Sequence, residues 1–341
     1  MGQFSSFKEE NSENEGVLKN ERIENNEGEN NYLEYYSSNI QGWKNQNDNT
    51  FTSKISQENQ KNYDIFCIFV GQNGNEISKF VNNHFYEELL NNINMTPNNI
   101  KNSIKQTFLK MNKLMKEKEG KEEIKQLKIN NLKKEIEEQP KIINKNESEI
   151  VNIELTEDEE EEILDYTGCT ACLILIDENN NKLYFGNLGN SEVLIYGKKE
   201  IFFESSHRPT DDKEKERIEK LKGLIINDKL FGVLNSTHGL GNFAYNSNNK
   251  NKILSDEPDI LEYNINEDDY IFMGTESIIE CIDKKNFGDI LKNKDNSLKE
   301  TFEKITKDNI AYDFYNNDSE FGFDNITCTL IKIKSINKKE A

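Results

Sequence analysis

Three short stretches of the sequence contain residues whose types and spacing could do chemistry. Cys169 and Cys172 stand in C-T-A-C, which has the spacing of a redox-active pair. Residues 68–75 read I-F-V-G-Q-N-G-N, a buried strand feeding a turn of the kind that holds a phosphate or a metal ion, yet this turn contains no charged residue. At the N-terminus, M-G-Q-F-S-S places Gly2 and Ser6 in the pattern of N-myristoylation.

The cysteine pair is better explained as part of a buried strand than as a redox site. It lies within T-A-C-L-I-L-I, and side chains three residues apart in a strand face opposite sides. The cysteines of the chain are scattered through apolar runs, and no secretory signal opens the sequence. Both observations predict a reducing, cytoplasmic location.

The charge and hydropathy of the chain restrict its partners. A net charge of −20 excludes nucleic acid as a main partner, because phosphate binding needs clustered Lys and Arg. The longest apolar runs, such as I-F-C-I-F-V at 65–70, have six residues, whereas a membrane helix needs about 20. Acylation of Gly2 would hold a membrane only marginally, since a single acyl chain binds weakly. We therefore expect at most peripheral association with the cytoplasmic face of a membrane, supported by a second signal or a protein partner.

The hydrophobic pattern predicts an acidic tail, one domain and a charged insertion. Residues 1–31 are rich in Glu and Asn and are expected to be disordered. The domain spans 32–335, and a short tail, 336–341, follows it. At about 112–165 a Lys- and Glu-rich helical stretch leads into a segment that contains E-D-E-E-E-E, whose like charges favour a solvated loop over a docking site for a basic partner.

Within the domain, strands in hairpins outnumber helices. The apolar run 65–70 precedes a helix that carries Ile77, Phe80 and His84 at helical spacing, and we expect His84 to pack rather than to bind a ligand. Further elements are predicted from alternation, caps and stop signals: strands at 170–176, 182–188, 191–196, 200–203, 270–273 and 326–333, and helices at 98–137, 210–223, 277–283 and 296–307. Neighbouring hairpins favour antiparallel sheets with helices packed outside them, which is an α+β fold.

Eight stretches follow one another in the order of the motifs of one family, and they cover most of the chain from Tyr35 to Ile333. They are, each with the family pattern, Y-Y-S-S-N-I-Q-G-W-K (S-S-x-Q-G-x-R), I-F-V-G-Q-N-G-N (V-x-D-G-H-G-G), T-G-C-T-A (S-G-C/S-T-A), L-Y-F-G-N-L-G-N-S-E (L-x-x-A-N-x-G-D-S-R), S-H-R-P (D-H-x-P), T-H-G-L-G-N (S/T-R-A-x-G-D), I-F-M-G-T-E-S (F-x-x-L-A-S/C-D-G) and F-D-N-I-T (x-D-N-x-T). In these motifs the chain resembles the metal-dependent Ser/Thr protein phosphatases of the PPM (type 2C) class. The resemblance implies the family's four-layer α-β-β-α sandwich of two antiparallel sheets flanked by helices.

The resemblance also implies a metal site that has lost much of its ligand set. In this family two divalent ions about 3.5 to 4 Å apart activate a bridging water, and several carboxylates hold them. The bridging Asp aligns with Gly71, and the proton-donating His aligns with Asn73. The other degenerate positions are Asn190 and Asn49, the vestigial metal ligands are Asp48, Glu276 and Asp324, and Lys44 stands where an Arg binds phosphate with two bonds. Glu76 and Asp64 are the nearby carboxylates considered as replacements for Gly71.

These changes favour an inactive, pseudophosphatase-like protein that acts as a membrane-associated binding or regulatory scaffold, without catalytic residues. No cofactor is expected, or at most a single Mg²⁺ or Mn²⁺ held by Glu276 and Asp324. The expected partner is a protein, with phosphoproteins and kinases as the classes to consider. One alternative is a metal-dependent phosphatase with a rearranged site and weak activity. Another is that residues 110–165 form the working surface while the sandwich serves as a platform.

Overall fold

The computed structural model describes residues 23–44, 46–56, 63–96, 98–138, 153–197, 200–203, 207–246, 252–291, 293, 296–308 and 324–336. The acylation motif at Gly2 and the rest of residues 1–22 lie outside the described residues, and so do residues 139–152 of the insertion and 337–341 of the C-terminal tail.

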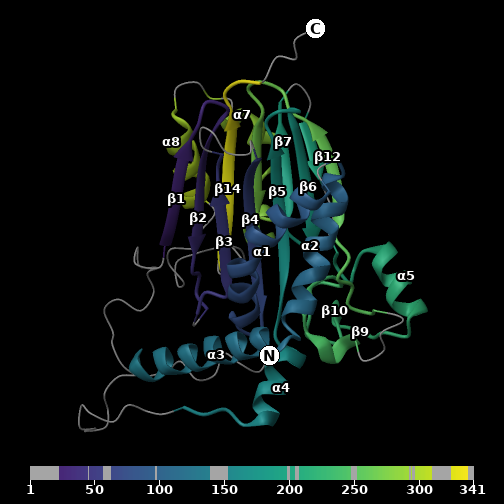
Figure 1. The fold of residues 1–341 in the computed structure, drawn as a ribbon. Coiled ribbons are helices and arrows are strands. Elements are labelled where there is room, and N and C mark those ends of the chain that lie inside the picture. Colours follow the sequence, from purple (N-terminus) through teal and green to yellow (C-terminus); the bar gives the residue numbers. More distant parts are fainter. Residues whose placement is uncertain are drawn as a thin grey trace.

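Apart from one short separate hairpin, the described strands form two antiparallel sheets of six strands each (Figure 1). The first sheet has the order β1-β2-β14-β13-β7-β8, and the second has the order β12-β6-β5-β4-β3 with the short β11 beside β5. The strand bounds are Ile23–Glu29 (β1), Leu33–Ile40 (β2), Asn49–Lys54 (β3), Tyr63–Gln72 (β4), Gly168–Asp177 (β5), Lys182–Leu188 (β6), Glu192–Tyr196 (β7), Glu200–Phe203 (β8), Leu240–Gly241 (β11), Asp259–Asn264 (β12), Tyr270–Gly274 (β13) and Ile326–Ile333 (β14).

Strand β4 shows why this sequence builds a sandwich. Its alternate residues Phe66 and Ile68 pack into the core between the sheets, while Ile65, Cys67 and Phe69 pack against helices on the outer face. A strand that is covered on both faces must be apolar throughout, because successive side chains point to opposite sides. The uninterrupted apolar run of the sequence is therefore a central strand.

The two cysteines of C-T-A-C confirm the interpretation as a strand. Cys169 belongs to the core under the helices of the second sheet, and Cys172 belongs to the core between the sheets. Both thiols are buried, and burial raises the pKa of each well above its usual value. A pair that faces opposite sides of one sheet cannot close a disulfide or act as a dithiol.

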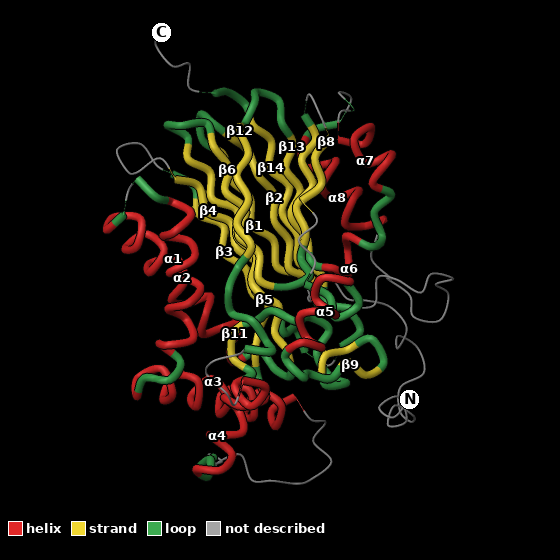
Figure 2. Tube along the Cα trace, turned by 90° about the vertical axis from the view of Figure 1, so that its right-hand side faces the viewer, coloured by secondary structure: helices red, strands yellow, loops and turns green. Residues whose placement is uncertain are grey.

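Helices cover the outer face of each sheet, which completes the four layers and confirms the predicted fold class. On the second sheet lie α1 (Glu76–Met95) and α2 (Ile100–Leu114), and on the first lie α6 (Glu276–Ile279), α7 (Lys284–Leu291) and α8 (Leu298–Asp308). Figure 2 shows the strands between these two groups of helices. None of the described helices combines the length and the apolar character needed to cross a membrane.

The prediction that residues 1–31 are disordered is wrong for Ile23–Glu29. This segment forms β1 and pairs along its whole length with β2. Its side chains are mostly exposed, so the hydrophobic pattern gave no signal; the backbone hydrogen bonds of an edge strand do not require apolar residues. At the other end, Ile336 packs against the core between the sheets, so the domain extends beyond 335.

The prediction of a solvated loop for the acidic run is also wrong. Residues Glu157–Tyr166 form helix α4, which begins with a capping box between Thr156 and Glu159. Carboxylates in the first turn interact favourably with the positive end of the helix dipole, and Ile163 anchors the helix in the core. The predicted continuous helix 98–137 is two helices, since α2 ends at Leu114 and α3 spans Lys118–Glu138.

A small module projects beside the sandwich and lies at the lower right of Figure 1. It contains α5 (Asp212–Lys220), the hairpin of β9 (Ile225–Ile226) with β10 (Lys229–Leu230), and the 3-10 turn Phe243–Asn246. Its own apolar cluster consists of Ile218, Leu230, Leu234 and Leu254. The N-cap of α5 is Asp211.

Candidate functional site

The end of β4 and the turn that joins it to α1 leave no room for a side chain at Gly71. Asn73 and Gly74 have positive φ angles of 60° and 126°. The N–H of Gly71 donates to the carbonyl oxygen of Asp48 at 3.0 Å. A Cβ atom at Gly71 would lie 2.4 Å from the carbonyl oxygen of Gly74 and 2.5 Å from that of Asp48. Any side chain at this position therefore requires a shift of the backbone.

Two carboxylates border this turn, and each has an unpartnered oxygen. Glu76, the first residue of α1, is buried; its Oε1 accepts a hydrogen bond from Nδ2 of Asn131 at 2.9 Å and lies 3.5 Å from Nζ of Lys128. Oε2 of Glu76 and Oδ1 of Asp48 have no hydrogen-bond partner among the described residues. Burial raises the pKa of Asp48 to about 6, Lys44 opposes this shift, and the charge of Glu76 adds to it.

Asp64, the other residue considered as a replacement for Gly71, lies at the far end of β4. The strand register pairs Asp64 with Ile176 and Gly71 with Cys169. Seven residues of strand at about 3.3 Å each separate the two positions by roughly 23 Å. Asp64 therefore cannot supply a ligand at the turn, whereas Glu76 lies beside it.

Lys44 and Asp324 are joined by an ion pair, with Nζ of Lys44 2.6 Å from Oδ1 of Asp324. The same oxygen accepts a hydrogen bond from the backbone N–H of Asn325 at 2.6 Å. Both side chains are about half exposed, so the pair adds little to stability. It does connect two predicted site residues: the cation at the phosphate-binding position lies against a carboxylate at a metal-ligand position.

Glu276 has both carboxylate oxygens occupied. Oε1 accepts a hydrogen bond from Nε of Arg208 at 2.6 Å, and Oε2 accepts one from Nδ2 of Asn190 at 2.5 Å. Burial raises the pKa of Glu276, as does the neighbouring Glu280, while Arg208 lowers it. Burial lowers the pKa of Arg208, but the charge and hydrogen bond of Glu276 outweigh it, so the net shift is upward. Asn190 and Arg208 thus bind one carboxylate oxygen of Glu276 each.

The two remaining degenerate positions have structural partners. Asn49 is buried in β3, and its Nδ2 donates to Oγ1 of Thr327 in β14 at 3.1 Å, which links the two sheets. Asn73 is exposed at the tip of the turn, and its Nδ2 donates to the carbonyl oxygen of Tyr166 at 3.2 Å. The amide of Asn49 uses an N–H donor that an ionised carboxylate at the same position would lack.

Reasoning from the sequence missed Arg208 and Glu192 as members of the site. Glu192 is buried in β7, and its Oε1 lies 3.8 Å from Nη2 of Arg208. The rarity of arginine, which occurs only at Arg22, Arg208 and Arg217, was the available signal, because arginine is the side chain that can bind several carboxylates at once.

The residues present do not fit a site for two divalent ions. Such a site needs several free carboxylates, one of them bridging, to offset the repulsion between the ions. Here the bridging position is an enclosed glycine, Glu276 is bound to Arg208 and Asn190, and Asp324 is bound to Lys44. In the described part of the chain, no group of three or more His, Cys, Asp or Glu side chains is arranged to hold a metal ion.

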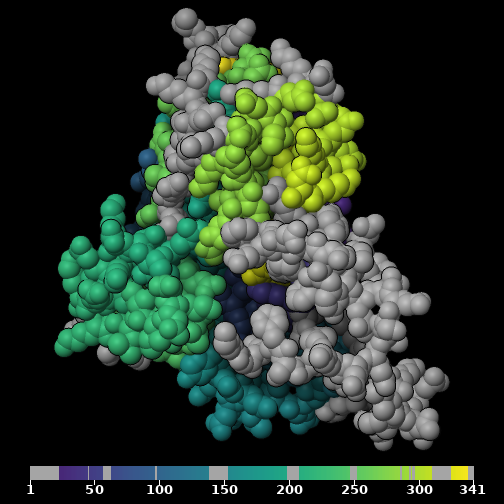
Figure 3. Space-filling view, turned by 180° about the vertical axis from the view of Figure 1, so that it is seen from behind, coloured from purple at the N-terminus to yellow at the C-terminus, as the bar shows by residue number. Residues whose placement is uncertain are grey.

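Figure 3 shows the molecule from behind, on the side of the module that contains α5 and of helices α7 and α8. Purple and dark-blue atoms lie in a recess between the green lobe, which contains α5, β9 and β10, and the yellow-green helices α7 and α8. The side chains named above come from the two sheets and from the segments that join them to α1, α5 and α6. The site therefore lies where both sheets meet, at one end of the sandwich.

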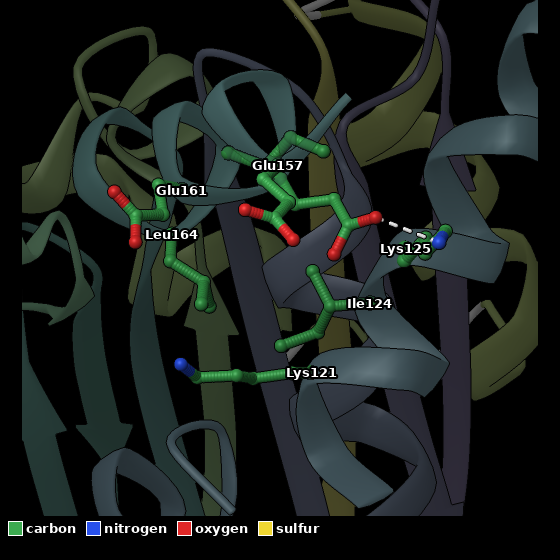
Figure 4. Close-up of a pocket in the computed structure, with 8 residues that line it drawn as sticks. Lys121, Ile124, Lys125, Glu157, Glu161 and Leu164 are labelled. Carbon is green, nitrogen blue, oxygen red and sulfur yellow. Dashed lines mark ion pairs between the residues drawn. The ribbon is translucent and has the colours of Figure 1, made fainter. Parts of the chain in front are cut away.

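The charged insertion adds a second surface below this end. Helices α3 and α4 border a pocket of about 160 Å³, which Figure 4 shows. Its apolar floor includes Ile124 and Leu164, and Nζ of Lys125 pairs with Oε1 of Glu160 at 2.7 Å on its rim. Because Asn131 of α3 bonds to Glu76, the insertion also contacts the candidate site directly.

Comparison with known proteins identifies the family to which the sequence is similar. The family model described as "Protein phosphatase 2C" matches residues 118–318. "Probable protein phosphatase 2C 6" of Paramecium tetraurelia is 28% identical over 317 residues, which cover 90% of this chain and 95% of that protein. "Probable protein phosphatase 2C 21" of Arabidopsis thaliana is 24% identical over 329 residues, covering 92% and 90%.

Solved structures show the same fold. A crystal structure of a phosphatase from a pathogenic strain of Toxoplasma gondii superposes with a TM-score of 0.62 at 13% identity, covering 93% of this chain and 97% of that one. The structure of a sex determining protein of C. elegans gives a TM-score of 0.61 at 16% identity, covering 88% and 64%. The family model alone spans more than half of the sequence, and the fold is that of the matched structures. This chain belongs to the protein phosphatase 2C family.

Proposed function

We propose that this chain is a pseudophosphatase of the family, which binds proteins rather than hydrolysing phosphate esters, and that it needs no metal cofactor. The observation that carries the proposal is Gly71. The position of the bridging carboxylate has no side chain, and a Cβ atom there would lie 2.4 Å from a carbonyl oxygen. The family's hydrolysis depends on two ions that share this ligand, so its loss removes the means of activating water.

The other degenerate positions support the same proposal. Lys44 retains a positive charge but cannot bind phosphate with two parallel bonds, and it lies against Asp324. Asn73 has no proton to donate to a leaving group at neutral pH. A fold that is retained although its catalytic groups are missing suits a protein that binds a partner. Phosphoproteins and kinases are the partner classes that we propose.

The test is hydrolysis by the purified full chain with Mg²⁺ or Mn²⁺, on an aryl phosphate and on a phosphothreonine peptide. We expect rates at background for both substrates. Metal-dependent turnover that disappears in Asp324→Ala would overturn the proposal, because it would show that the vestigial ligands still support catalysis.

A second candidate function is a weakly active phosphatase with a rearranged single-ion site, and one observation favours it. Oδ1 of Asp48 and Oε2 of Glu76 have no hydrogen-bond partner among the described residues, although both atoms are buried beside the turn. A Mg²⁺ ion is commonly bound by one or two carboxylates plus water and substrate. Under this alternative Glu76→Gln abolishes turnover, whereas under the pseudophosphatase proposal there is no turnover to lose.

The proposed location is the cytoplasmic face of a membrane, reached through an acyl chain on Gly2. Support comes from the N-terminal motif alone, and a single acyl chain needs a second contact to hold the protein there. The test compares the membrane fraction of wild-type protein with that of Gly2→Ala. A variant that distributes like the wild type rules out acylation as the anchor.

A further inference from the structure

We infer that Arg208 is a built-in counter-ion that holds a latent cation site closed, and that removing its guanidinium would turn the surrounding carboxylates into a site for one divalent cation. The inference rests on the proposed function and explains how the carboxylates at the candidate site are stabilised without a metal ion. It concerns Glu192, Glu276 and Glu280, which we call the carboxylate cluster.

The cluster surrounds the guanidinium from two elements. Nε of Arg208 lies 2.6 Å from Oε1 of Glu276, and Nη2 lies 3.4 Å from Oε1 of Glu280 and 3.8 Å from Oε1 of Glu192. Glu276 and Glu280 are one turn apart at α6, while Glu192 comes from β7. One planar side chain therefore contacts three carboxylates, which is the kind of multiple contact that a metal ion makes.

The cluster needs positive charge to fold. The side chain of Glu192 is only 4% exposed, and removing a carboxylate from water is costly unless a cation compensates it. Nζ of Lys284 supplies one such charge at 2.7 Å from Oε2 of Glu192. Arg208 supplies the other, and without it Glu276 and Glu280 would repel each other on adjacent turns of the chain.

The contact with Asn190 indicates that the arrangement is specific. Its amide donates to the oxygen of Glu276 that Arg208 leaves open, so both oxygens are satisfied without a metal ion. Because the guanidinium belongs to the same chain, its local concentration is fixed by the fold and not by the supply of cations. The guanidinium is therefore present at the carboxylate cluster whatever cations the solution contains.

The experiment compares wild type, Arg208→Met and the double variant Arg208→Met with Glu276→Gln, using the full chain. Thermal unfolding is recorded in EDTA and in Mn²⁺, and Mn²⁺ binding is titrated by calorimetry. Wild type should unfold at the same temperature in both media. Arg208→Met should unfold about 4 to 8 °C lower in EDTA, recover most of this loss in Mn²⁺ and bind one additional Mn²⁺ compared with wild type; the double variant should neither recover nor bind it.

Arg217→Met is the matched control. Arg217 also pairs with a carboxylate, with Nη2 2.7 Å from Oε2 of Glu214, but it lies outside the cluster. Its removal should lower the unfolding temperature without any recovery in Mn²⁺. Recovery of both variants would show that Mn²⁺ stabilises the protein generally and would overturn the inference.

Two other results would overturn it as well: an Arg208→Met variant that binds no additional Mn²⁺, or a wild-type protein whose Mn²⁺ binding is lost in Glu276→Gln. If Arg208→Met is soluble only when produced with Mn²⁺, the inference is supported. If it is insoluble in both media, Arg208→Lys decides: a soluble variant that binds no additional Mn²⁺ supports a need for charge, and an insoluble one contradicts it.

Hydrolysis by the wild type would refute the proposed function while leaving these results unchanged.

Discussion

His207 and His238 stack face to face, with ring centroids 3.7 Å apart and ring planes 5° from parallel. Both are buried; Nδ1 of His207 accepts a hydrogen bond from the N–H of Gly189, and Nδ1 of His238 donates to the carbonyl oxygen of Glu257. Burial lowers the pKa of His238, although the carboxylate of Glu214 opposes the shift. The pair is therefore stable only as long as His238 stays neutral.

We predict that the contribution of His238 to the stability of the domain is lost as the pH falls below about 6.5, the usual pKa of histidine. The unfolded chain binds a proton at His238 near this pH, while the folded chain does so only at lower pH, so acid favours unfolding. Between pH 5.5 and 6.5, His238→Gln should reduce the change in the free energy of unfolding with pH by up to about 1 kcal/mol per pH unit. Urea unfolding at pH 5.5, 6.5 and 7.5 measures this, and equal slopes for the two proteins would contradict it.

At the opposite end of the sandwich, Asp64 and Glu178 predict a loss of stability at high pH. Nδ2 of Asn30 donates to Oδ1 of Asp64 at 3.2 Å and to Oε1 of Glu178 at 2.9 Å. Burial, together with the charge of Glu178, raises the pKa of Asp64 from 3.8 to about 8. The folded state therefore keeps a proton on Asp64 that the unfolded state releases, and the contribution of Asp64 to stability falls as the pH rises from 3.8 to about 8.

Asp64→Asn should remove this dependence. The free energy of unfolding of the variant relative to wild type should increase by at least about 1.4 kcal/mol between pH 6 and pH 8.5. This amount corresponds to a pKa shift of one unit. Guanidinium unfolding at the two pH values measures the difference. If the free energies of unfolding of variant and wild type change equally over this pH range, Asp64 is ionised in the folded protein.

Gly71→Ala should destabilise the domain by about 1 to 3 kcal/mol, because the added methyl group would meet two carbonyl oxygens that cannot move independently of the backbone. Gly239→Ala is a milder comparison that should cost less than Gly71→Ala, since its Cβ atom would lie 3.2 Å from the carbonyl oxygen of Cys169, against 2.4 Å for the nearest carbonyl oxygen at Gly71. Chemical denaturation of both variants is the measurement, and a neutral Gly71→Ala would mean that the turn has room for a carboxylate.

For the same reason, restoring carboxylates at Gly71, Asn190 and Asn49 together should not create a phosphatase. Asn190 and Asn49 donate hydrogen bonds to Glu276 and Thr327, and a carboxylate would abolish both. Displacements near 1 Å lower rates by about 100-fold. Brisk Mn²⁺-dependent hydrolysis of a phosphopeptide by the triple variant would refute this expectation.

Asn131→Ala should weaken the attachment of helix α3 to the site by about 1 to 3 kcal/mol, since the buried Oε1 of Glu76 would lose a hydrogen-bond donor. Its amide also donates to Oδ1 of Asn75 at 2.7 Å. The exposed Asn130 provides the control, and Asn130→Ala should change the free energy of unfolding by less than about 0.5 kcal/mol. Hydrogen exchange in α3 should increase only in Asn131→Ala.

Much of the fold was predictable because apolar periodicity reports burial on one or both faces. The uninterrupted run of β4 and the stripe of α1 gave a central strand and a covering helix. The exceptions are elements stabilised by something other than apolar burial. Strand β1 is held by backbone hydrogen bonds to β2, and α4 depends on the capping box at Thr156 and on one buried isoleucine.

The site was predictable position by position but not as a set of contacts. Motif order placed Lys44, Asp324, Asn190 and Glu276, and the structure brings them together in two pairs. Sequence spacing contains no information about which side chain fills the space left by a lost ligand. Arg208 lies 68 residues before Glu276 in the chain, so its contact with that carboxylate depends on the folded sheets.

Strand β1 has a consequence for the behaviour of the protein in a crowded cell. It forms the outer edge of the first sheet, and its other edge has no neighbouring strand in the described part of the chain. An open edge can pair with a strand from another molecule and start aggregation. The sequence I-E-N-N-E-G-E places carboxylates at Glu24, Glu27 and Glu29 along this edge, and Lys299 and Lys334 pair with the last two, so an incoming strand would meet charged side chains. The Glu- and Asn-rich composition that resembles a disordered tail thereby disfavours edge-to-edge pairing of two sandwiches.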